Sequence, residues 1–401
     1  MGMQVDHVSF SSTGGAGRVA QDIVTAQQEA GLDAAFMHLV DLDLVREPFK
    51  NPNVSLAALV DKYLISNGYS DTLTSFARGR ISNLRRMGIR AKSIINLHWT
   101  EGVITPRDLK DLESAGRRMV WTMHDMRPFT GFCHHSHNCE GFTKDCRHCP
   151  QVRPVFHPLI ASNFKEKSGL IPRPEALKVV VPSEWMKSKL GKSPMFVDHD
   201  VEMIPNPLAR AFLSKQNKSE ARHELGLSGS SFIGISVAEQ LESEGKKVLD
   251  TIHSFFATTS VLGIEAHYII VGNGGERLAG HPGVIHLSGR SSEGVARAIA
   301  ASDVLINMSV AESSGMTVLE AAALGIPSVA RRVGGLKESI VDGVTGFTCL
   351  DFKELKLALI QLIRDPLKAT QFGECARSQS LERNSPSAVA DSYLHLYQSF
   401  R

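Results

Sequence analysis

The chain has 401 residues, enough for two or three domains of ordinary size. Apolar residues make up 42% and charged residues 21%, which excludes an intrinsically disordered chain. The 44 Lys and Arg nearly balance the 42 Asp and Glu, so bulk charge excludes a strongly basic nucleic-acid-binding protein. No signal-peptide pattern and no run of about 18 uncharged apolar residues is present, so we expect a cytoplasmic protein with reduced thiols.

Short apolar runs alternate with helical segments along the whole chain, which predicts α/β architecture with parallel strands. The predicted strands are at residues 5–10, 34–40, 93–98, 119–124, 179–182, 203–205, 232–237, 266–271, 284–287, 304–308 and 328–330. A turn signal at Asn206-Pro207 and a polar stretch to residue 228 divide them into two groups. We therefore predict two doubly wound domains of similar size, at residues 1–205 and 206–384.

The C-terminal residues 385–401 are predicted to form one more helix. Ser385 suits the N-cap and Pro386 suits the first helical position. An apolar stripe at helical spacing follows, made of Val389, Tyr393, Leu396, Tyr397 and Phe400. Such a stripe must pack on something. We predict a helix that crosses back to the N-terminal domain, with packing on its own domain as the alternative.

A glycine-rich segment at residues 11–20 follows the first predicted strand and opens a helix. Glycine allows a ligand to approach the backbone closely, and the N–H groups at a helix start attract anions. The spacing Gly15-x-Gly17-x-x-Ala20 fits a dinucleotide-binding fingerprint, with Asp41 where a ribose-binding acid would lie. The motif alone is weak, because a tight strand-to-helix turn explains it almost as well.

The strongest candidate site follows the predicted strand at residues 304–308. A helix is predicted from near Gly315 to about Leu324, and its first N–H groups would point at a ligand. Glu312 precedes this turn, and Glu320 lies inside the helix. Carboxylates beside an anion-binding turn should avoid phosphate and accept hydrogen bonds from hydroxyls. A sugar nucleotide, a diphosphate flanked by two polyols, satisfies this arrangement; for Glu320 alone, a solvated helix residue is the alternative.

Besides the glutamate pair, further motifs occur in order along the chain: Gly14-Gly15-Ala16-Gly17-Arg18, Asn96-Leu97-His98-Trp99, Trp121-Thr122-Met123-His124-Asp125-Met126-Arg127-Pro128-Phe129-Thr130-Gly131, Val181-Pro182-Ser183-Glu184-Trp185, Ile204-Pro205-Asn206-Pro207, Arg332-Val333-Gly334-Gly335-Leu336-Lys337-Glu338 and Asp342-Gly343-Val344-Thr345-Gly346-Phe347. In this ordered set the sequence resembles the family-4 retaining glycosyltransferases over nearly its whole length. That resemblance implies the GT-B fold, two doubly wound Rossmann-like domains facing a central cleft.

The resemblance implies roles in donor binding at the matching positions. Glu312 would contact hydroxyls of the donated sugar, and Glu320 would bind the ribose. Backbone groups of Ser314, Gly315 and Met316 would meet the sugar and the diphosphate. Ser314 departs from the family pattern, because an aromatic residue is common at its position.

Three further positions complete the set of site residues that the resemblance implies. Gly15 would approach the diphosphate from the opposite domain, and His124 would face the transferred sugar near the acceptor. Lys246 matches the lysine that neutralises the diphosphate leaving group. Many members carry an arginine a few residues earlier, but residues 237–240 contain none. Phosphate neutralisation would then depend more on Lys246, with Lys247 as a possible helper.

Four of the six cysteines fall inside an insert at residues 131–150, which should lie near the acceptor entrance. They are Cys133, Cys139, Cys146 and Cys149. This spacing suits a closed tetrahedral zinc site, of which Cys146-x2-Cys149 is the best part. Zinc is the leading interpretation, and free thiols, a disulfide or an iron–sulfur centre are the alternatives.

Residues 72–100 contain no Asp or Glu and have six cations: Arg78, Arg80, Arg85, Arg86, Arg90 and Lys92. Such a stretch could meet an anionic membrane surface or an acceptor pyrophosphate, or it could be ordinary solvated surface. No nucleic-acid-binding motif accompanies it.

The resulting hypothesis is a retaining glycosyltransferase in exopolysaccharide, O-antigen or capsule assembly, cytoplasmic and peripheral to the inner membrane face. Its partners would be a UDP- or GDP-linked sugar and a saccharide or polyprenyl-pyrophosphate-linked acceptor. Catalysis would need no metal cofactor. A nicotinamide-dependent oxidoreductase is the first alternative, and a non-catalytic protein that binds sugar nucleotides or lipids is the second.

Overall fold

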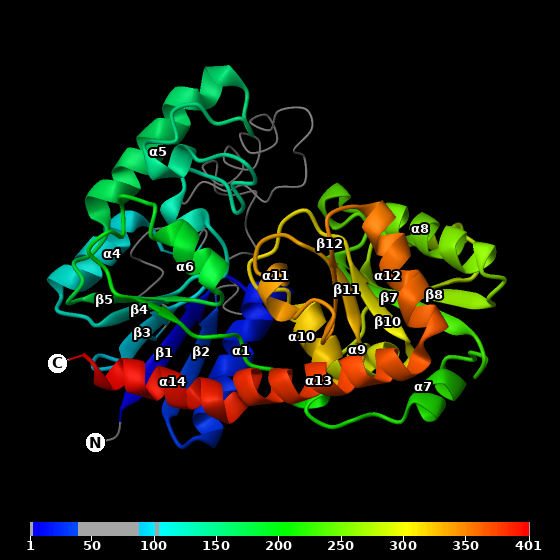
Figure 1. Cartoon of the computed structure of the whole chain (residues 1–401). Helices are drawn as coiled ribbons and strands as arrows, with labels where there is room; N and C mark the ends of the chain where they lie inside the picture. The colour runs from blue at the N-terminus through cyan, green and yellow to red at the C-terminus, as the bar shows by residue number, and fades with distance from the viewer. Residues whose placement is uncertain (1–2, 39–87, 101–103, 401) are drawn as a thin grey trace. The chain divides into compact units, whose positions relative to one another are not determined.

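The computed structural model describes residues 3–38, 88–100 and 104–400, and the chain divides into two compact units. Unit 1 comprises residues 1–205 and 389–401, and unit 2 comprises residues 206–388. In the described residues each unit contains one six-stranded sheet, and all neighbouring strands in both sheets are parallel. Figure 1 labels helices and strands of each unit.

Unit 1 has its strands in the order β2-β1-β3-β4-β5-β6. The strands are β1 (Gln4–Ser9), β2 (Asp33–His38), β3 (Ile94–Leu97), β4 (Met119–Thr122), β5 (Leu177–Val181) and β6 (Val201–Met203). The α-helices among the described residues of this unit are α1 (Gly14–Glu29), α4 (Pro106–Ser114), α5 (His157–Leu170), α6 (Glu184–Leu190) and, from the C-terminus, most of α14 (Pro386–Gln398).

Unit 2 has the order β12-β11-β10-β7-β8-β9. Its strands are β7 (Phe232–Gln240), β8 (Ala266–Asn273), β9 (Val284–Leu287), β10 (Val304–Asn307), β11 (Ser328–Arg331) and β12 (Gly346–Cys349). Its helices are α7 (Lys218–Glu224), α8 (Val248–Val261), α9 (Ser292–Ala301), α10 (Met316–Ala323), α11 (Leu336–Ser339), α12 (Phe352–Arg364) and α13 (Pro366–Asn384). Apolar side chains on both faces of this sheet form its core.

Both sheets have a point where the strand order reverses. In unit 1 the chain goes from β1 outward to β2 and then returns to the other side of β1 at β3. In unit 2 it goes from β7 to β8 and β9, and returns beside β7 at β10. Loops that follow two such strands diverge, which leaves a crevice at their carboxyl ends where ligands bind in open α/β sheets. The two reversal points are therefore the places to look for a site.

The predicted α/β class and the presence of two doubly wound sheets are confirmed. Every predicted strand coincides with an observed one to within a few residues. The strand predicted at residues 203–205 lies earlier, at Val201–Met203, because Pro205 cannot donate to a sheet. Among the described residues, the apolar runs do not predict β12, whose four residues pair with β11 at the edge of the sheet. Its sequence Gly-Phe-Thr-Cys follows a turn and is too short to show a period.

The C-terminal helix α14 begins at Pro386, and the Ser385 hydroxyl accepts a hydrogen bond from the N–H of Ala388 at 3.4 Å. The side chains of the predicted stripe are buried. Those of Tyr393 and Tyr397 form hydrogen bonds to Thr122 and Gln27 of unit 1. None of the helices in the described part of the chain is long and apolar enough to span a bilayer.

Candidate functional site

The reversal point of unit 2 brings together two charged side chains from distant parts of the sequence. Lys246 lies in the loop after β7, and Glu312 lies in the loop after β10, the neighbouring strand. Lys246 Nζ is 2.5 Å from Glu312 Oε1. The side chains are 35% and 19% exposed, so the pair remains accessible to a ligand. Two residues predicted separately for phosphate and sugar binding are thus direct neighbours.

Backbone contacts hold the two loops of this pair together. The N–H of Val310 donates to the carbonyl of Gly245 at 2.9 Å, which ties the loop after β10 to the loop after β7. Lys246 ends a short 3-10 turn, and Lys247 adopts a left-handed conformation with a φ of 54°. Helix α8 begins immediately after this residue. The position of Lys246 is therefore set by main-chain geometry on both sides.

The predicted helix start after Glu312 is present and is built around one glycine. Gly315 has a φ of 74°, a conformation that a side chain disfavours, and its Cβ would lie 2.7 Å from Leu336. Helix α10 begins at the next residue, Met316, so the N–H groups of its first turn lack partners within the helix. Glu320 lies in the middle of this helix and is partly exposed.

Residues to which sequence reasoning assigned no role support this turn. Asn206 Nδ2 donates to Ser314 Oγ at 3.1 Å, and Ser339 Oγ donates to the carbonyl of Ser314 at 2.9 Å. A Cβ on Gly334 would lie 1.9 Å from the carbonyl oxygen of Glu312, and one on Gly335 would lie 2.2 Å from that of Ser313. The Gly-Gly pair therefore allows its backbone to lie close to that of Glu312 and Ser313. In the sequence, only the motif that contains the two glycines indicates their importance.

In unit 1, His124 follows β4 and lies beside a second histidine. Its Nε2 is 3.0 Å from Nδ1 of His98, and the two rings stack with centroids 5.2 Å apart. Burial lowers the pKa of His124 to about 4, although the nearby Asp125 carboxylate opposes this shift. At neutral pH the imidazole is uncharged, so it can act as a hydrogen-bonding group but not as a fixed positive charge.

The segment after His124 is anchored by its own polar contacts. Asp125 Oδ2 is 2.6 Å from His134 Nδ1, and Asp125 Oδ1 accepts from the N–H of Arg127 at 2.8 Å. Burial opposes ionisation of Asp125, but His134 and the Arg127 N–H outweigh it and hold its pKa at about 2. The buried Lys167 of α5 donates to the carbonyls of Arg127 and Thr130. No local sequence pattern predicts this role for Lys167.

The glycine-rich turn of unit 1 contains three glycines, and the local structure requires only two of them to be glycine. Gly14 has a φ of 76°, and a Cβ on Gly17 would lie 2.5 Å from the carbonyl oxygen of Ser11, so the fold itself requires both. A Cβ on Gly15 would meet no atom within 4 Å. Packing within the described part of the chain therefore does not explain glycine at position 15. Asp41, the other half of the fingerprint, lies outside the described residues.

The four cysteines of the insert line one pocket together with Phe132, Phe142 and Ile160. None of the six cysteines, all of them described, forms a disulfide. Backbone N–H groups of Gly141 and Gly131 point at the sulfurs of Cys139 and Cys146, at 3.3 and 3.2 Å. Nevertheless, no group of three or more His, Cys, Asp or Glu side chains among the described residues has the geometry of a metal site.

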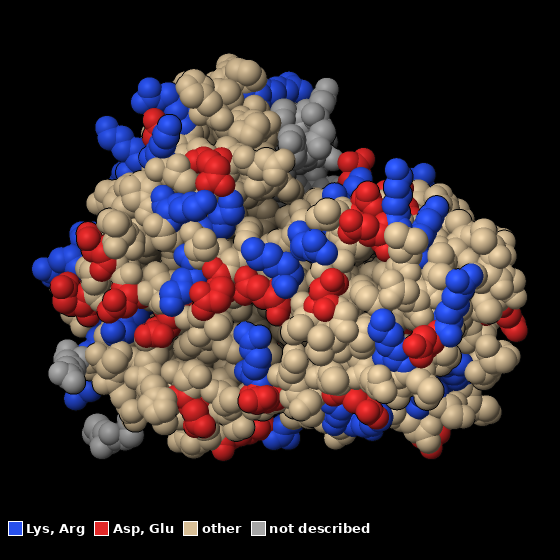
Figure 2. Space-filling model, in the orientation of Figure 1, with Lys and Arg blue, Asp and Glu red and all other residues tan. Residues whose placement is uncertain are grey.

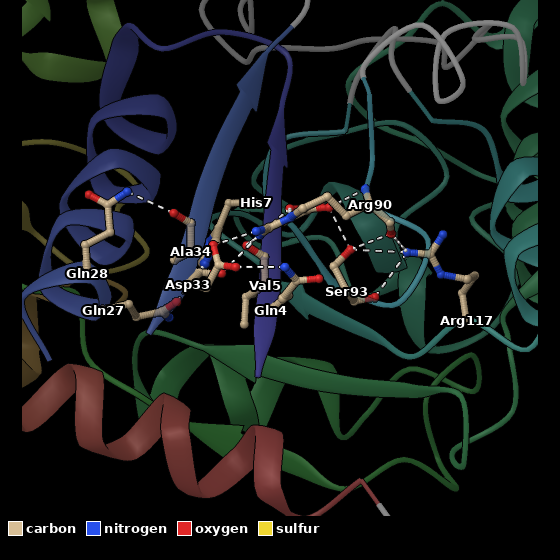
Figure 3. A network of polar contacts seen from close by, with 11 residues as sticks. Gln4, Val5, His7, Gln27, Gln28, Asp33, Ala34, Arg90, Ser93 and Arg117 are labelled. Atoms are coloured by element: carbon tan, nitrogen blue, oxygen red, sulfur yellow. Dashed lines mark hydrogen bonds and ion pairs between the residues drawn. The ribbon is translucent and has the colours of Figure 1, made fainter. Parts of the chain in front are cut away.

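Most of the basic stretch, including Arg78, Arg80, Arg85 and Arg86, lies outside the described residues. Arg90 is described, and it is committed to the fold. Its guanidinium and main chain donate to Asp6, and its Nη1 lies 2.5 Å from Asp33 (Figure 3). Arg90 therefore does not offer a free charge to a membrane. On the face drawn in Figure 2, blue and red side chains are interspersed.

Comparisons with known proteins agree with this picture. Residues 237–365 match the family described as "Glycosyl transferases group 1". The chain is 28% identical over 210 residues to N-acetyl-alpha-D-glucosaminyl L-malate synthase of Bacillus anthracis, covering 49% of this chain and 53% of that protein. It is 40% identical over 79 residues to trehalose synthase of Pyrococcus horikoshii, covering 20% and 19%. The chain thus matches about half the length of the first relative and about a fifth of the second.

Solved structures match over nearly the whole chain. Sucrose-phosphate synthase from Thermosynechococcus elongatus has a TM-score of 0.67 at 16% identity, covering 99% of this chain and 98% of that one. HepE of Anabaena, solved with UDP and glucose, has a TM-score of 0.62 at 17% identity, covering 99% and 100%. At such identities the likeness shows the fold alone. The fold is GT-B, with two Rossmann-like units. The match to the glycosyl transferases group 1 is confined to residues 237–365, which lie within unit 2.

Proposed function

We propose that the protein transfers a sugar from a nucleotide-sugar donor to a saccharide or lipid-linked acceptor, with retention of anomeric configuration. The observation that carries the proposal is the pairing of Lys246 with Glu312 beside the first turn of α10, at the reversal point of the unit 2 sheet. This arrangement offers a cation, helix N–H groups and a carboxylate within one small region. Anionic diphosphate and neutral sugar hydroxyls need these three kinds of group.

Each side chain then has a distinct role in donor binding. Backbone N–H groups of Ser314, Gly315 and Met316 bind the diphosphate oxygens, and Lys246 neutralises the charge that develops as the diphosphate leaves. Glu312 accepts hydrogen bonds from hydroxyls of the donated sugar. Without ligand, Lys246 and Glu312 neutralise each other, and a bound diphosphate would take over the lysine. Glu320 accepts hydrogen bonds from the ribose.

Retention follows from a same-face displacement. The bond between the anomeric carbon and the phosphate oxygen breaks, and the acceptor hydroxyl oxygen attacks that carbon from the same face. Its proton passes to the departing phosphate oxygen, so no carboxylate nucleophile is required, unlike in a double-displacement glycosidase. His124 faces the transferred sugar as a neutral hydrogen-bonding group. Divalent metal is not part of this scheme.

Gly15 is proposed to contact the diphosphate from unit 1. The support is that the packing of unit 1 explains Gly14 and Gly17 but not Gly15. Close approach of a ligand to the backbone would explain why this position lacks a side chain. The oxidoreductase alternative uses the same glycines but gives no role to Lys246, Glu312 or Glu320. For that reason, transfer of a sugar is the better proposal.

Several structural neighbours were solved with a nucleotide or a nucleotide sugar bound. HepE was solved with UDP-glucose, and the pneumococcal O-GlcNAc transferase GtfA with UDP and GlcNAc. We propose a UDP- or GDP-linked donor for this chain. The proposed acceptor is a saccharide or a polyprenyl-pyrophosphate-linked intermediate of surface-polysaccharide assembly, reached at the cytoplasmic face of the membrane.

The cysteine insert is proposed to hold a structural zinc ion. Cys133, Cys139, Cys146 and Cys149 line one pocket, and the N–H groups directed at two of the sulfurs are contacts that favour a thiolate. Burial raises the pKa of Cys133 and Cys149, so uncharged thiols are expected unless a cation is bound. Elemental analysis of the purified protein should find about one zinc per chain. Cys146→Ser should lose it, whereas Cys349→Ser, outside the cluster, should keep it. Native protein without metal would remove the proposal.

The donor site is tested by two glutamate variants and one matched control. Glu320→Ala should weaken binding of the nucleotide, since it removes the ribose contact. Glu312→Ala should mainly lower turnover, since it removes contacts to the transferred sugar. Glu374→Ala, an exposed glutamate on α13 of the same unit, should change neither. The readouts are calorimetric titration with UDP and GDP, and turnover with the corresponding sugar nucleotides. Wild-type affinity and turnover in both site variants would contradict the assignment.

A further inference from the structure

A chain of buried side chains runs from His124 into the interior of unit 1. His124 Nε2 is 3.0 Å from His98 Nδ1, and His98 Nε2 is 2.8 Å from Nδ1 of His7. His7 Nε2 is 2.9 Å from Oε1 of Gln27, and Gln27 Nε2 donates to the Tyr397 hydroxyl at 3.0 Å. His7, His98, Gln27 and Tyr397 are each at most 2% exposed. Helix α14 is therefore connected to a predicted site residue through four hydrogen bonds.

The far end of this chain is fixed by a second set of contacts. Asn96 Nδ2 donates to the Tyr397 hydroxyl at 2.9 Å, and Thr122 Oγ1 donates to Asn96 Oδ1 at 2.9 Å. The Tyr393 hydroxyl is 3.0 Å from Thr122 Oγ1. The oxygen of Tyr397 thus accepts hydrogen bonds from two amides. This leaves Oε1 of Gln27, an acceptor, facing His7, which is drawn with Gln27 in Figure 3.

The three histidines are uncharged, which makes the chain directional. Burial lowers the pKa of His7 and of His124 to about 4, and that of His98 well below its ordinary value. A neutral imidazole has one N–H and one bare nitrogen. Because Gln27 Oε1 can only accept, Nε2 of His7 must carry the proton, and Nδ1 of His7 must be bare. His98 must then donate from Nε2, and His124 must do the same.

We propose that Gln27 and Tyr397 are positioning residues that set the tautomer of His124 through His7 and His98. His124 is held as the Nε2–H tautomer, with Nδ1 unprotonated. Its remaining nitrogen can accept a hydrogen bond from a sugar or acceptor hydroxyl but cannot donate one. This specificity for a hydroxyl donor rests on the proposed function, whereas the tautomer itself does not.

A role in setting the tautomer requires one particular position for the ring proton of each histidine, whereas a role in packing does not. Stacked histidines that only fill space could adopt either tautomer, provided each bond has one proton. Here a single acceptor at the base of the chain fixes all three rings in the same sense. Loss of that acceptor should allow both tautomers at all three histidines, even though His7 and His98 lie between Gln27 and His124.

Nitrogen-15 NMR of the full-length protein with labelled histidine tests the tautomers directly. In wild type at pH 7, His7, His98 and His124 should each show a protonated Nε2 and a bare Nδ1. Assignment uses the loss of signals in His7→Gln, His98→Gln and His124→Gln. A protonated Nδ1 or a charged ring at any of the three positions in wild type would overturn the proposal, whatever the outcome of activity assays.

Two methionine variants then separate the acceptor from general packing. Gln27→Met keeps the length of the buried side chain but removes Oε1, so His124 should show a mixture of tautomers. Gln28→Met makes the same change one residue later on α1, at an exposed glutamine that bonds to the carbonyl of Ala34, and should leave the wild-type pattern. Tyr397→Phe, which removes the oxygen that orients Gln27, should also mix the tautomers. An unchanged Nε2–H pattern in folded Gln27→Met and Tyr397→Phe would contradict the proposed role.

Discussion

The two units have sheets of the same size and the same type of strand order, but they place their polar groups differently. In unit 2, the strands at the reversal point are largely apolar, and the charged pair Lys246–Glu312 lies on loops beyond them. In unit 1, polar side chains such as Asp6, His7 and Asn96 are buried on the strands themselves.

This difference separates polar groups that the fold requires from polar groups that a ligand requires. When a partly exposed loop side chain is removed, water can form hydrogen bonds with the groups that it leaves behind. A polar side chain buried on a central strand leaves its partners unsatisfied when it is removed, and that cost is large. Mutation of the buried polar residues of unit 1 should therefore lower the stability of the fold, whereas mutation of the loop residues of unit 2 should weaken ligand binding.

The largest effect is expected at Asp6, which is fully buried on β1. Its carboxylate accepts from the main chain and the guanidinium of Arg90 and from the hydroxyl of Ser93. Asp6→Ala should lower the free energy of unfolding of unit 1 by about 3 kcal/mol, because it leaves these donors unpaired. Urea titration followed by tryptophan fluorescence reports this unit selectively, since all three tryptophans, Trp99, Trp121 and Trp185, lie in it.

The control for Asp6 is Asp33, which bonds to the same arginine but lies at the surface, with its side chain 54% exposed. Asp33→Ala should have a much smaller effect, because solvent screens the pair. Equal losses of stability in the two variants would mean that burial does not decide the cost.

The next effect concerns Asp125, whose pKa in the folded protein is about 2, below its ordinary value of 3.8. A carboxyl with a lowered pKa stabilises the fold above its ordinary pKa, and this contribution disappears as pH falls from about 4 to about 2. Asp125→Asn should therefore cost about 2 kcal/mol at pH 7 and progressively less below pH 4. Urea titrations of both proteins over this pH range give the difference.

The exposed Asp111 on α4 supplies a matched substitution for Asp125. Asp111→Asn should leave the unfolding transition close to wild type at every pH. If the cost of Asp125→Asn stayed constant down to pH 2, the ionised carboxylate would not be its source.

The smallest effect on stability is expected at the loop pair of unit 2. Lys246→Met should change the free energy of unfolding by less than about 1 kcal/mol, because Lys246 and Glu312 are both partly exposed. Circular dichroism at helical wavelengths reports the helices of both units, whereas tryptophan fluorescence reports unit 1 alone, so the difference between the two signals follows the unfolding of unit 2. A loss of several kcal/mol would show that the pair supports the fold and would remove the contrast between the units.

The same contrast explains what could be predicted from the sequence. The loop site of unit 2 was predictable, because Glu312, Gly315 and Glu320 lie within nine consecutive residues and carry a local pattern. Lys246 required a resemblance to known proteins, since only the adjacency of β7 and β10 brings it to Glu312. The strands were predictable from continuous apolar runs, and β12 was missed because four residues carry no period.

The polar core of unit 1 was not predictable from local sequence. His7, Gln27, Asn96 and Tyr397 are far apart in the chain, and each alone is an ordinary strand or helix residue. Their connection depends on how α14 packs within unit 1. The apolar stripe predicts that this helix packs on something, but it does not predict which side chains Tyr397 meets. Arg90 illustrates the same limit, because its place in a basic stretch did not show that Asp6 and Asp33 bind it.

A thermal-shift titration tests the central claim most directly, that the loop pair of unit 2 binds a nucleotide sugar. Wild-type protein, Lys246→Met and the control Lys356→Met, at an exposed lysine on α12 of the same unit, are compared with UDP-glucose, UDP-GlcNAc, GDP-mannose and NAD. A ligand at about 100 times its dissociation constant stabilises its protein by about 2.7 kcal/mol. We expect at least one sugar nucleotide to raise the Tm of wild type and of Lys356→Met, with a much smaller rise in Lys246→Met. A shift with NAD alone, or an equal shift in Lys246→Met, would contradict the account.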